Sequence, residues 1–370
     1  MIHFVAPAAN AWTVYQYLSE WGKGVADRFR ILHYESLAER TSFDRGTYVL
    51  AALELSPALQ HLVEELYQCL SATNCVRFLN HPTRTLRRYA LLQELRRLNL
   101  NGFRAVRLNE GVAALRYPVF LRSDWEHTGA LSSLLHSPSE VECVGQAVWQ
   151  GHRWEELLAV EFHDTADADG HYRKYSAYIV GDRILPKNLE YGRSWMLKHA
   201  QCEFSERMLL EEREYIVGNP HVAQLREIFA IAGVEYGRID YAIKDGRVQT
   251  WEINLHPTIG RGPVATRKKR VPPELEPLRN VGKEHFYRGF AAAWEAVDLP
   301  SEGGPPVAIA FDVRTTGEAR SRLASRGFMQ ALRRGARPLK PLLKPLCRPV
   351  FTALARLARR AYTRRRLDVD

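Results

Sequence analysis

The chain has 370 residues with 52 Lys or Arg and 42 Asp or Glu, which gives a formal net charge of +10. The excess is concentrated at one end: residues 314–370 hold 16 basic and 3 acidic residues, which leaves 36 basic and 39 acidic residues before them. This distribution excludes a uniformly basic nucleic-acid-binding protein. It indicates a nearly neutral globular body followed by a cationic tail.

Length and composition also bound the class of protein. Hydrophobic residues make up 46% of the chain and charged residues 25%, as in ordinary globular proteins with two or three domains. No apolar run reaches eighteen residues, and the first residues lack the pattern of a secretory signal. The five cysteines form no CxxC and no zinc-binding spacing. We therefore expect a cytoplasmic protein with reduced thiols.

The first hundred residues alternate between apolar strands and amphipathic helices. The helix at 56–70 is clear, because Ser56 suits its N-cap, Pro57 suits its first turn and the apolar residues keep the helical period. Alternating strands and helices predict a parallel α/β layer. The predicted strands are 2–6, 29–33, 47–53, 75–79 and 103–108, and the predicted helices are 11–21, 56–70 and 82–98.

The pattern changes near residues 110–116, after which strands pair through tight turns. Turn dipeptides at residues 181–182 and 245–246 predict two hairpins, and Gly233 suits the end of the helix before the second hairpin. This part is therefore predicted to be antiparallel α+β. Its predicted strands are 117–122, 156–162, 172–180, 183–185, 238–244 and 247–254, and its predicted helices are 140–149 and 221–232.

The second hairpin carries the most informative chemistry. Strand alternation places Arg238 and Asp240 on one face of its first strand, and Glu252 and Asn254 on one face of its second strand. If the two faces coincide, two carboxylates and an amide oxygen converge beside an arginine. Such hard oxygen ligands suit magnesium held against nucleotide phosphates. The alternative is a solvent-facing side of a hairpin that carries ordinary surface charge.

This pattern, Arg-x-Asp-Tyr, a turn, and Glu-Ile-Asn followed by a proline, resembles the metal-binding end of the ATP-grasp superfamily. The resemblance implies an N-terminal α/β domain, a small lid subdomain and a larger antiparallel lobe, with ATP between two antiparallel sheets. It implies that Asp240, Glu252 and Asn254 bind one or two Mg²⁺ ions. It also implies that Arg238 stabilises the transferred phosphoryl group or the tetrahedral intermediate.

Other segments resemble the family in the expected order. The strand ending at Arg122 resembles the one that delivers a lysine to the ATP phosphates, here with arginine instead. The loop after it has one glycine, where many relatives have several. Residues 156–162 resemble the hinge strand that reads adenine, and residues 187–199 lie where relatives bind substrate. The resemblance thus implies ATP contacts for Arg87, Arg122, Glu161, Phe162 and Lys174, and weaker substrate contacts for Lys187, Lys198 and His199.

The resemblance divides the chain into an α/β domain (1–115), a lid subdomain (116–175), a lobe with the magnesium site (176–300) and a linker with tail (301–370). It implies an ATP-dependent, carbon–nitrogen bond-forming ligase that activates a small-molecule or peptide carboxylate as an acyl phosphate for attack by an amine or other nucleophile. The alternatives are phosphoryl transfer without ligation and a catalytically inactive ATP-binding scaffold recruited by the tail.

The tail contains a predicted basic amphipathic helix. Phe351, Leu354 and Leu357 share an apolar face, while arginines dominate the remainder. Such a helix can bind an anionic membrane surface or an acidic partner protein. We therefore expect residues 314–366 to bring a cytoplasmic protein to such a surface. A solubilising tail without a partner and a nucleic-acid-binding tail are the alternatives, the second being the less favoured.

Overall fold

The computed structural model describes residues 1–125, 129–148, 154–197, 201–260, 271–299 and 304–312. They belong to one compact unit, Met1–Thr315. The predicted tail helix lies outside the described residues, as do Lys198 and His199. Among the described helices, none has both the length and the apolar character needed to cross a membrane.

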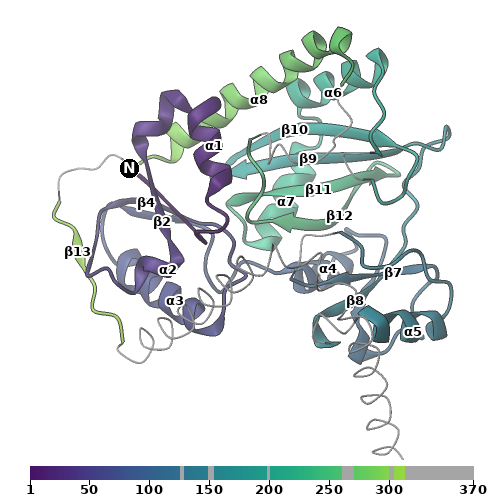
Figure 1. The fold of residues 1–370 in the computed structure, drawn as a ribbon, viewed down its shortest axis with the longest axis horizontal. Helices are drawn as coiled ribbons and strands as arrows, with labels where there is room; N and C mark the ends of the chain where they lie inside the picture. The colour runs from purple at the N-terminus through teal and green to yellow at the C-terminus, as the bar shows by residue number, and fades with distance from the viewer. Residues whose placement is uncertain (126–128, 149–153, 198–200, 261–270, 300–303, 313–370) are drawn as a thin grey trace, which may run out of the picture. The chain divides into compact units, whose positions relative to one another are not determined.

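A four-stranded parallel sheet forms the N-terminal part (Figure 1). Strands β1 and β4 are buried along their whole length, as expected for a parallel sheet with both faces covered. The predicted parallel α/β layer is therefore confirmed. In spatial order its strands are β2 (Phe29–His33), β1 (Ile2–Ala6), β4 (Gly46–Leu50) and β5 (Val76–Leu79), and its helices are α1 (Trp12–Glu20), α2 (Tyr34–Leu37) and α3 (Pro57–Ser71).

A three-stranded antiparallel sheet follows. Because β6 pairs with β8, this sheet begins before the expected boundary at residue 116. Helix α4 begins at Arg88 rather than at residue 82, since the N–H of Leu86 bonds to the carbonyl of Ala232 and ties the preceding segment to another part of the chain. The elements are α4 (Arg88–Arg97), β6 (Ala105–Arg107), β7 (Val119–Ser123), α5 (Pro138–Val148) and β8 (Leu157–Glu161), in the spatial order β6-β8-β7.

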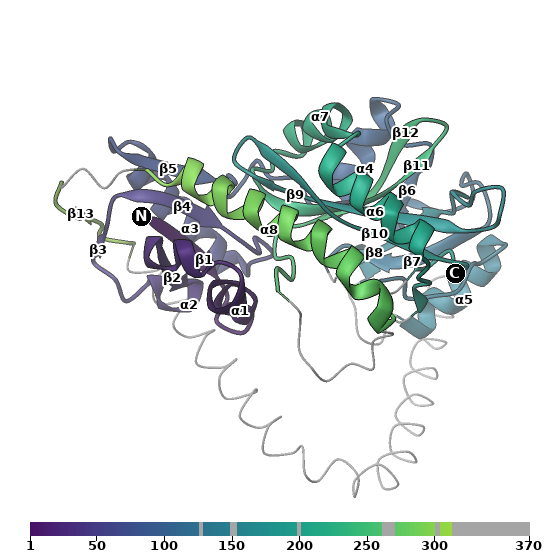
Figure 2. The ribbon, with the colours of Figure 1, turned by 90° about the horizontal axis from the view of Figure 1, so that it is seen from above.

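The third sheet is four-stranded and antiparallel, and both predicted hairpins belong to it. Two of its helices, α6 and α8, were not predicted. Figure 2 shows α8 running from beside α6 toward the first sheet, where Trp294 packs against Phe4 and Phe29. The elements are β9 (Tyr172–Val180), β10 (Arg183–Gly192), α6 (Glu206–Gly218), α7 (Val222–Ala232), β11 (Tyr236–Lys244), β12 (Arg247–Asn254) and α8 (Glu276–Val297), in the spatial order β10-β9-β11-β12.

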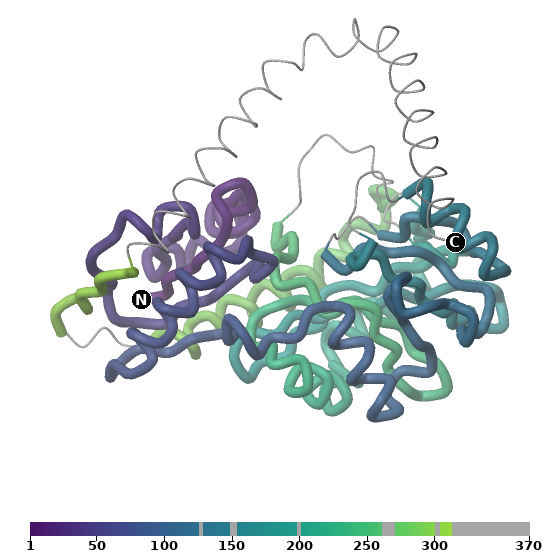
Figure 3. Tube along the Cα trace, turned by 90° about the horizontal axis from the view of Figure 1, so that it is seen from below, coloured from purple at the N-terminus to yellow at the C-terminus, as the bar shows by residue number. Residues whose placement is uncertain are grey.

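The segment after α8 returns to the N-terminal part (Figure 3). Strand β13 (Val307–Ala308) pairs with β3 (Ser42–Phe43), and the ring of Phe311 lies 5.8 Å from that of Phe43. Residues 304–312, expected as a linker, are therefore packed against the body of the protein. The described residues also include the short 3-10 helices η1 (Lys23–Arg28), η2 (Leu108–Glu110), η4 (Trp154–Glu156) and η6 (Pro273–Leu275).

One buried amide joins the first sheet to the third. The side-chain nitrogen of Asn80 donates to the carbonyls of Leu50 (3.0 Å) and Tyr236 (2.8 Å), and its oxygen accepts from the N–H groups of Glu235 (2.9 Å) and Tyr236 (3.0 Å). Both donors and both lone pairs of the amide are thereby satisfied. Asn80 has φ +69°, a conformation that asparagine tolerates better than most residues. Its side chain therefore links β4 to β11 through the same kind of hydrogen bonds that a backbone segment between them would make.

A second buried amide joins the start of the three-stranded sheet to β12. Asn101 is 1% exposed, donates to the carbonyl of Thr250 (2.8 Å) and accepts from the N–H of the same residue (2.9 Å). This is the pair of bonds that a neighbouring strand would make. The hairpin β11–β12 is thus fixed to the first sheet by Asn80 and to the three-stranded sheet by Asn101.

We expect Asn80→Ala to lower the free energy of unfolding by about 3 kcal/mol, because it leaves several buried backbone N–H and C=O groups without hydrogen-bond partners. Urea denaturation monitored by tryptophan fluorescence would measure the loss. Asn99→Ala is the matched control, since Asn99 also has positive φ (+57°) but is exposed. Equal losses in the two variants would show that backbone strain, rather than the buried bonds, explains the effect.

Candidate functional site

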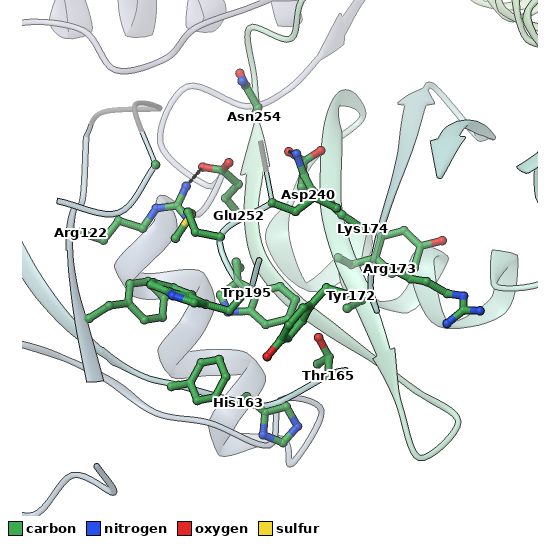
Figure 4. Close-up of a pocket in the computed structure, with 18 of the residues that line it drawn as sticks. Arg122, His163, Thr165, Tyr172, Arg173, Lys174, Trp195, Asp240, Glu252 and Asn254 are labelled. Atoms are coloured by element: carbon green, nitrogen blue, oxygen red, sulfur yellow. Dashed lines mark hydrogen bonds and ion pairs between the residues drawn. The ribbon is translucent and has the colours of Figure 1, made fainter. Parts of the chain in front are cut away.

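A cavity of about 410 Å³ lies between the two antiparallel sheets (Figure 4), a size typical of small-molecule sites. One end is lined by aromatic rings and the other by charged side chains. The residues that line the cavity include Phe120, Arg122, Phe162, His163, Lys174, Trp195, Arg238, Asp240, Trp251, Glu252 and Asn254.

The hairpin register brings the predicted oxygen ligands together. Arg238 pairs with Asn254 across β11 and β12, and Asp240 pairs with Glu252. Directly opposed residues have Cβ atoms about 5 Å apart, so the two carboxylates share one face as the alternation predicted. The turn is formed by an Asp-Gly pair that has positive φ at both residues, +51° and +74°, as the two-residue turn favoured in hairpins requires.

The carboxylate of Asp240 is held by two cations. Arg238 donates to both of its oxygens, at 2.8 and 3.0 Å, and Nζ of Lys174 lies 3.3 Å from Oδ2. Asp240 raises the pKa of Lys174 above its ordinary value. Burial opposes the charge of Arg238, but the neighbouring Asp240 keeps the pKa of Arg238 above its ordinary value as well. Both cations therefore stay charged.

The carboxylate of Glu252 is held by two different cations. Arg88 of α4 and Arg122 of β7 each place a guanidinium nitrogen 2.5 Å from its Oε2. Arg88 also donates to the carbonyl of Ser123. Burial, and then the positive charge of Arg122, lower the pKa of Arg88. From the sequence, Arg84, Arg87 and Arg88 lie in a segment that resembles the helix opening the family's ATP site, and Arg87 is the predicted ATP contact; the pairing of Arg88 with Glu252, 164 residues away, was not predicted.

Cations outnumber carboxylates among the residues that line the cavity: Arg122, Arg173, Lys174 and Arg238 against Asp240 and Glu252. Of these cations, Arg173 pairs with Asp167 and Glu211 outside the lining. Two further charged groups contact the lining from outside it, Arg88 at Glu252 and Glu190 at Lys174. A surplus of cations is expected where a protein binds a polyanion such as the phosphates of a nucleotide.

The aromatic end forms a slot suited to a flat ring. Trp195 lies 5.0 Å from Phe120 and 5.9 Å from Phe162, measured between ring centroids. Trp251 is the extra residue where the β11–β12 register shifts, and it stacks on Phe103 at 5.3 Å with an interplanar angle of 14°. Stacking on such rings is the usual way to hold a base.

Three of the five residues expected to contact ATP line the cavity, and two do not. Arg122, Phe162 and Lys174 line the cavity, whereas Glu161 and Arg87 do not. Arg87 precedes α4 and lies over the ring of Trp125, 4.0 Å from its centroid. Its neighbour Arg88 reaches the charged end instead.

Glu161 lies on the opposite face of its strand from the cavity. It points to the same face of β8 as Leu157 and Ala159, which pack in the core beneath α5. The alternate residues Leu158 and Val160 point to the cavity side, where they pack with Phe120. The fully buried Glu161 accepts hydrogen bonds from the backbone and guanidinium groups of Arg104 and Arg116 at 2.8–3.2 Å. Its place indicates a structural role for the side chain, and strand parity within residues 156–162 was the signal that could have shown this.

Lys187, expected near substrate, instead anchors the loop that leaves the hairpin. Its Nζ donates to the carbonyls of Thr258 (3.1 Å) and Ile259 (2.8 Å) and to the hydroxyl of Tyr178 (3.2 Å). From helix α1, the hydroxyl oxygen of Thr13 accepts from the N–H of Ile259 (2.7 Å). The loop that follows Asn254 is therefore held from two sides.

A second group of possible metal ligands, Asp167, Asp169 and His171, lies in the turn before β9. Their closeness follows from the turn, because Asp167 accepts the N–H groups of Asp169 (2.9 Å) and His171 (2.8 Å). Asp167 also forms an ion pair with Arg173. These contacts explain the group without a metal.

Comparisons with known proteins give only remote likeness. No protein-family model matches the chain, and no curated protein matches it in sequence. Two crystal structures of D-alanine–D-alanine ligase from Bacillus anthracis are similar in fold. The first has 11% identity and a TM-score of 0.44, and the second, complexed with ATP, has 12% and 0.43; each match covers 80% of this chain and 99% of the ligase.

The predicted mixture of a parallel sheet with antiparallel sheets is what the structure has. Likeness at this TM-score and identity does not establish a shared activity. The function has to be inferred from the cavity itself.

The buried Glu161 gives a prediction for stability against pH. Burial alone would raise its pKa, but the hydrogen bonds from Arg116 and Arg104 hold the pKa below the ordinary value. A depressed folded-state pKa stabilises the protein at pH above about 4.3, the ordinary value for glutamate, and this contribution fades as the pH falls further. We expect Glu161→Gln to cost about 2 kcal/mol at pH 7 and clearly less at pH 3.5, as measured by urea denaturation.

Glu94→Gln provides the control for this prediction. Glu94 also accepts two hydrogen bonds from an arginine, Arg97, at 2.8 and 2.5 Å, but this pair is exposed to solvent. Its loss should change stability far less than the loss of Glu161. A pH-independent cost of Glu161→Gln would contradict the assignment of the effect to the carboxylate charge.

Proposed function

We propose that the chain is an ATP- and Mg²⁺-dependent ligase of ATP-grasp type, which activates a carboxylate as an acyl phosphate for attack by an amine or other nucleophile. The main support is the cross-strand pair of Asp240 and Glu252, with Arg238 and Asn254 beside it, at the cationic end of a cavity whose other end is aromatic. A nucleotide needs both ends: rings for its base and cations for its phosphates.

The donor set fits magnesium. Two carboxylates and an amide on paired strands offer hard oxygen atoms, and Mg²⁺ is commonly held by one or two carboxylates together with substrate phosphates. When bound there, Mg²⁺ would neutralise charge that develops on the transferred phosphoryl group. The residues proposed as ligands for one or two such ions are Asp240, Glu252 and Asn254.

The side chains divide the remaining work. Trp195 and Phe162 would hold the base and exclude water from that end, which strengthens electrostatic interactions inside the cavity. Arg88 and Arg122, which pair with Glu252 in this structure, would turn to the phosphates, since guanidinium groups bind phosphate oxygens strongly. Arg238, oriented by its two bonds to Asp240, would stabilise the phosphoryl group and then the tetrahedral intermediate.

Two alternatives use the same cavity. A phosphotransferase would move the phosphoryl group to its acceptor without forming a further bond, and a scaffold would bind ATP without turnover. For residues 314–366 we propose binding to an anionic membrane surface or an acidic partner protein, on the basis of their charge alone. We propose that the protein acts in the cytoplasm.

We expect the wild-type protein to bind Mg-ATP and to release ADP when supplied with mixtures of amino acids and small dicarboxylic acids. Glu252→Gln should keep metal-free ATP binding but lower ADP release at least 100-fold, because it removes a charged ligand of the ion. Calorimetry and a coupled ADP assay would measure the two properties. ATP binding without turnover by the wild type would favour the scaffold, and absence of ATP binding would refute the proposal.

Arg122→Ala should weaken ATP binding about 10- to 100-fold, because it removes a charge-assisted phosphate contact. Arg122→Lys should recover part of the affinity, since lysine keeps the charge and loses the bidentate geometry. Arg97→Ala is the control, as Arg97 is exposed and pairs with Glu94 on α4. Unchanged affinity in Arg122→Ala would remove Arg122 from the phosphate site.

A further inference from the structure

Asp240 and Glu252 face each other, but the cations that pair with them come from different parts of the fold. Both oxygens of Asp240 accept hydrogen bonds from Arg238, and Oδ2 is also 3.3 Å from Nζ of Lys174. All three residues belong to the sheet that carries the hairpin. Glu252, by contrast, is held by two arginines that come from outside that sheet.

The sheet itself fixes the position of the Lys174 ammonium. Lys174 lies directly opposite Glu190 of β10 and 3.5 Å from its carboxylate. On the other side it lies diagonally from Asp240, because Ser176 is the cross-strand partner of Asp240. Diagonal neighbours on one face are within reach of a long side chain. Lys174 therefore lies between two carboxylates, one on each of the two strands that flank its own strand.

This arrangement leaves little room for a metal ion at Asp240. A divalent ion would lie about 2.1 Å from the carboxylate oxygen that binds it. Such an ion would come within a few ångströms of both the Lys174 ammonium and the Arg238 guanidinium. Like charges so close together, away from bulk water, repel strongly.

Glu252 is placed differently. Its partners Arg88 and Arg122 come from α4 and β7, outside the sheet of the hairpin, so their transfer to a phosphate would not require the hairpin to move. In the part of the chain that the structure describes, the buried Nε of Arg122 has no hydrogen-bond partner, and an incoming phosphate would satisfy it. Asn254 lies two residues further along the same face of β12, and its amide oxygen accepts a hydrogen bond from the N–H of His256 at 2.7 Å, which leaves one lone pair for an ion.

We propose that the cavity binds a single divalent ion, at Glu252 and Asn254, and that the ammonium of Lys174 takes the place of a second ion beside Asp240. The inference rests on the proposed function, because the ion is the one that accompanies the nucleotide phosphates. Asp240 then orients two protein cations, Lys174 and Arg238, toward the phosphates. Lys174 then supplies one positive charge where a second divalent ion would supply two, and the site requires only one ion from solution.

The test counts ions. The full chain is saturated with the non-hydrolysable analogue AMP-PNP, and bound Mn²⁺ is measured by equilibrium dialysis and electron paramagnetic resonance. The expected result is one Mn²⁺ per chain in the wild type and in Lys174→Arg, and two in Lys174→Gln, where the ammonium is removed. Asp240→Asn should keep one ion, and Glu252→Gln should raise the dissociation constant of that ion at least tenfold.

Lys283→Gln is the matched control, because Lys283 has the same side-chain exposure as Lys174, 35%, and also pairs with a glutamate, Glu276, at 3.3 Å. It should bind one ion. Two ions in the wild type, loss of the ion in Asp240→Asn, or a single ion in Lys174→Gln would overturn the inference while leaving nucleotide binding intact. If Lys174→Gln does not fold, the wild-type and Asp240→Asn counts still decide. Failure of the wild type to bind AMP-PNP would refute the proposed function and this inference with it.

Discussion

The fixed position of the hairpin β11–β12 is the constraint on which the rest of the site depends, and two buried asparagines impose it. Asn80 bonds to the backbone at the start of β11, and Asn101 bonds to Thr250 in the middle of β12. An amide that uses all its donors and acceptors on backbone groups acts as a piece of secondary structure, and a buried group left without its partner is costly. The opposed carboxylates therefore rest on a rigid support.

This rigidity has an electrostatic consequence. Asp240 and Glu252 would repel each other if both were charged and unaccompanied in a partly buried cavity. Each is instead accompanied by two cations, which come from β9, β11, β7 and α4. The cavity therefore brings its charges together before any ligand arrives. Around Asp240, where Arg238 and Lys174 are proposed to keep their places, such preorganisation avoids reorganising the charges during phosphoryl transfer.

The sequence predicted features that depend on neighbours along the chain. The Asp-Gly turn fixed the register of the hairpin, and Ser56 with Pro57 marked the start of α3, so both were visible in a local pattern. Contacts that depend on distant residues were not visible. Arg88 meets Glu252 across 164 residues, and α8 is held by rings such as Phe4 and Phe29 from the opposite end of the chain. Glu161 falls between these cases, since strand parity alone indicates which face it occupies.

Net charge is a poor guide to such a site. The first 313 residues have three more acidic than basic residues, yet cations outnumber carboxylates among the residues that line the cavity. The local surplus arises because the antiparallel strands contribute arginines and a lysine to one place. Binding energy for a polyanion depends on the few cations within a Debye length in a poorly screened cavity. The arrangement of charge in the fold, rather than its total, therefore determines what the cavity can bind.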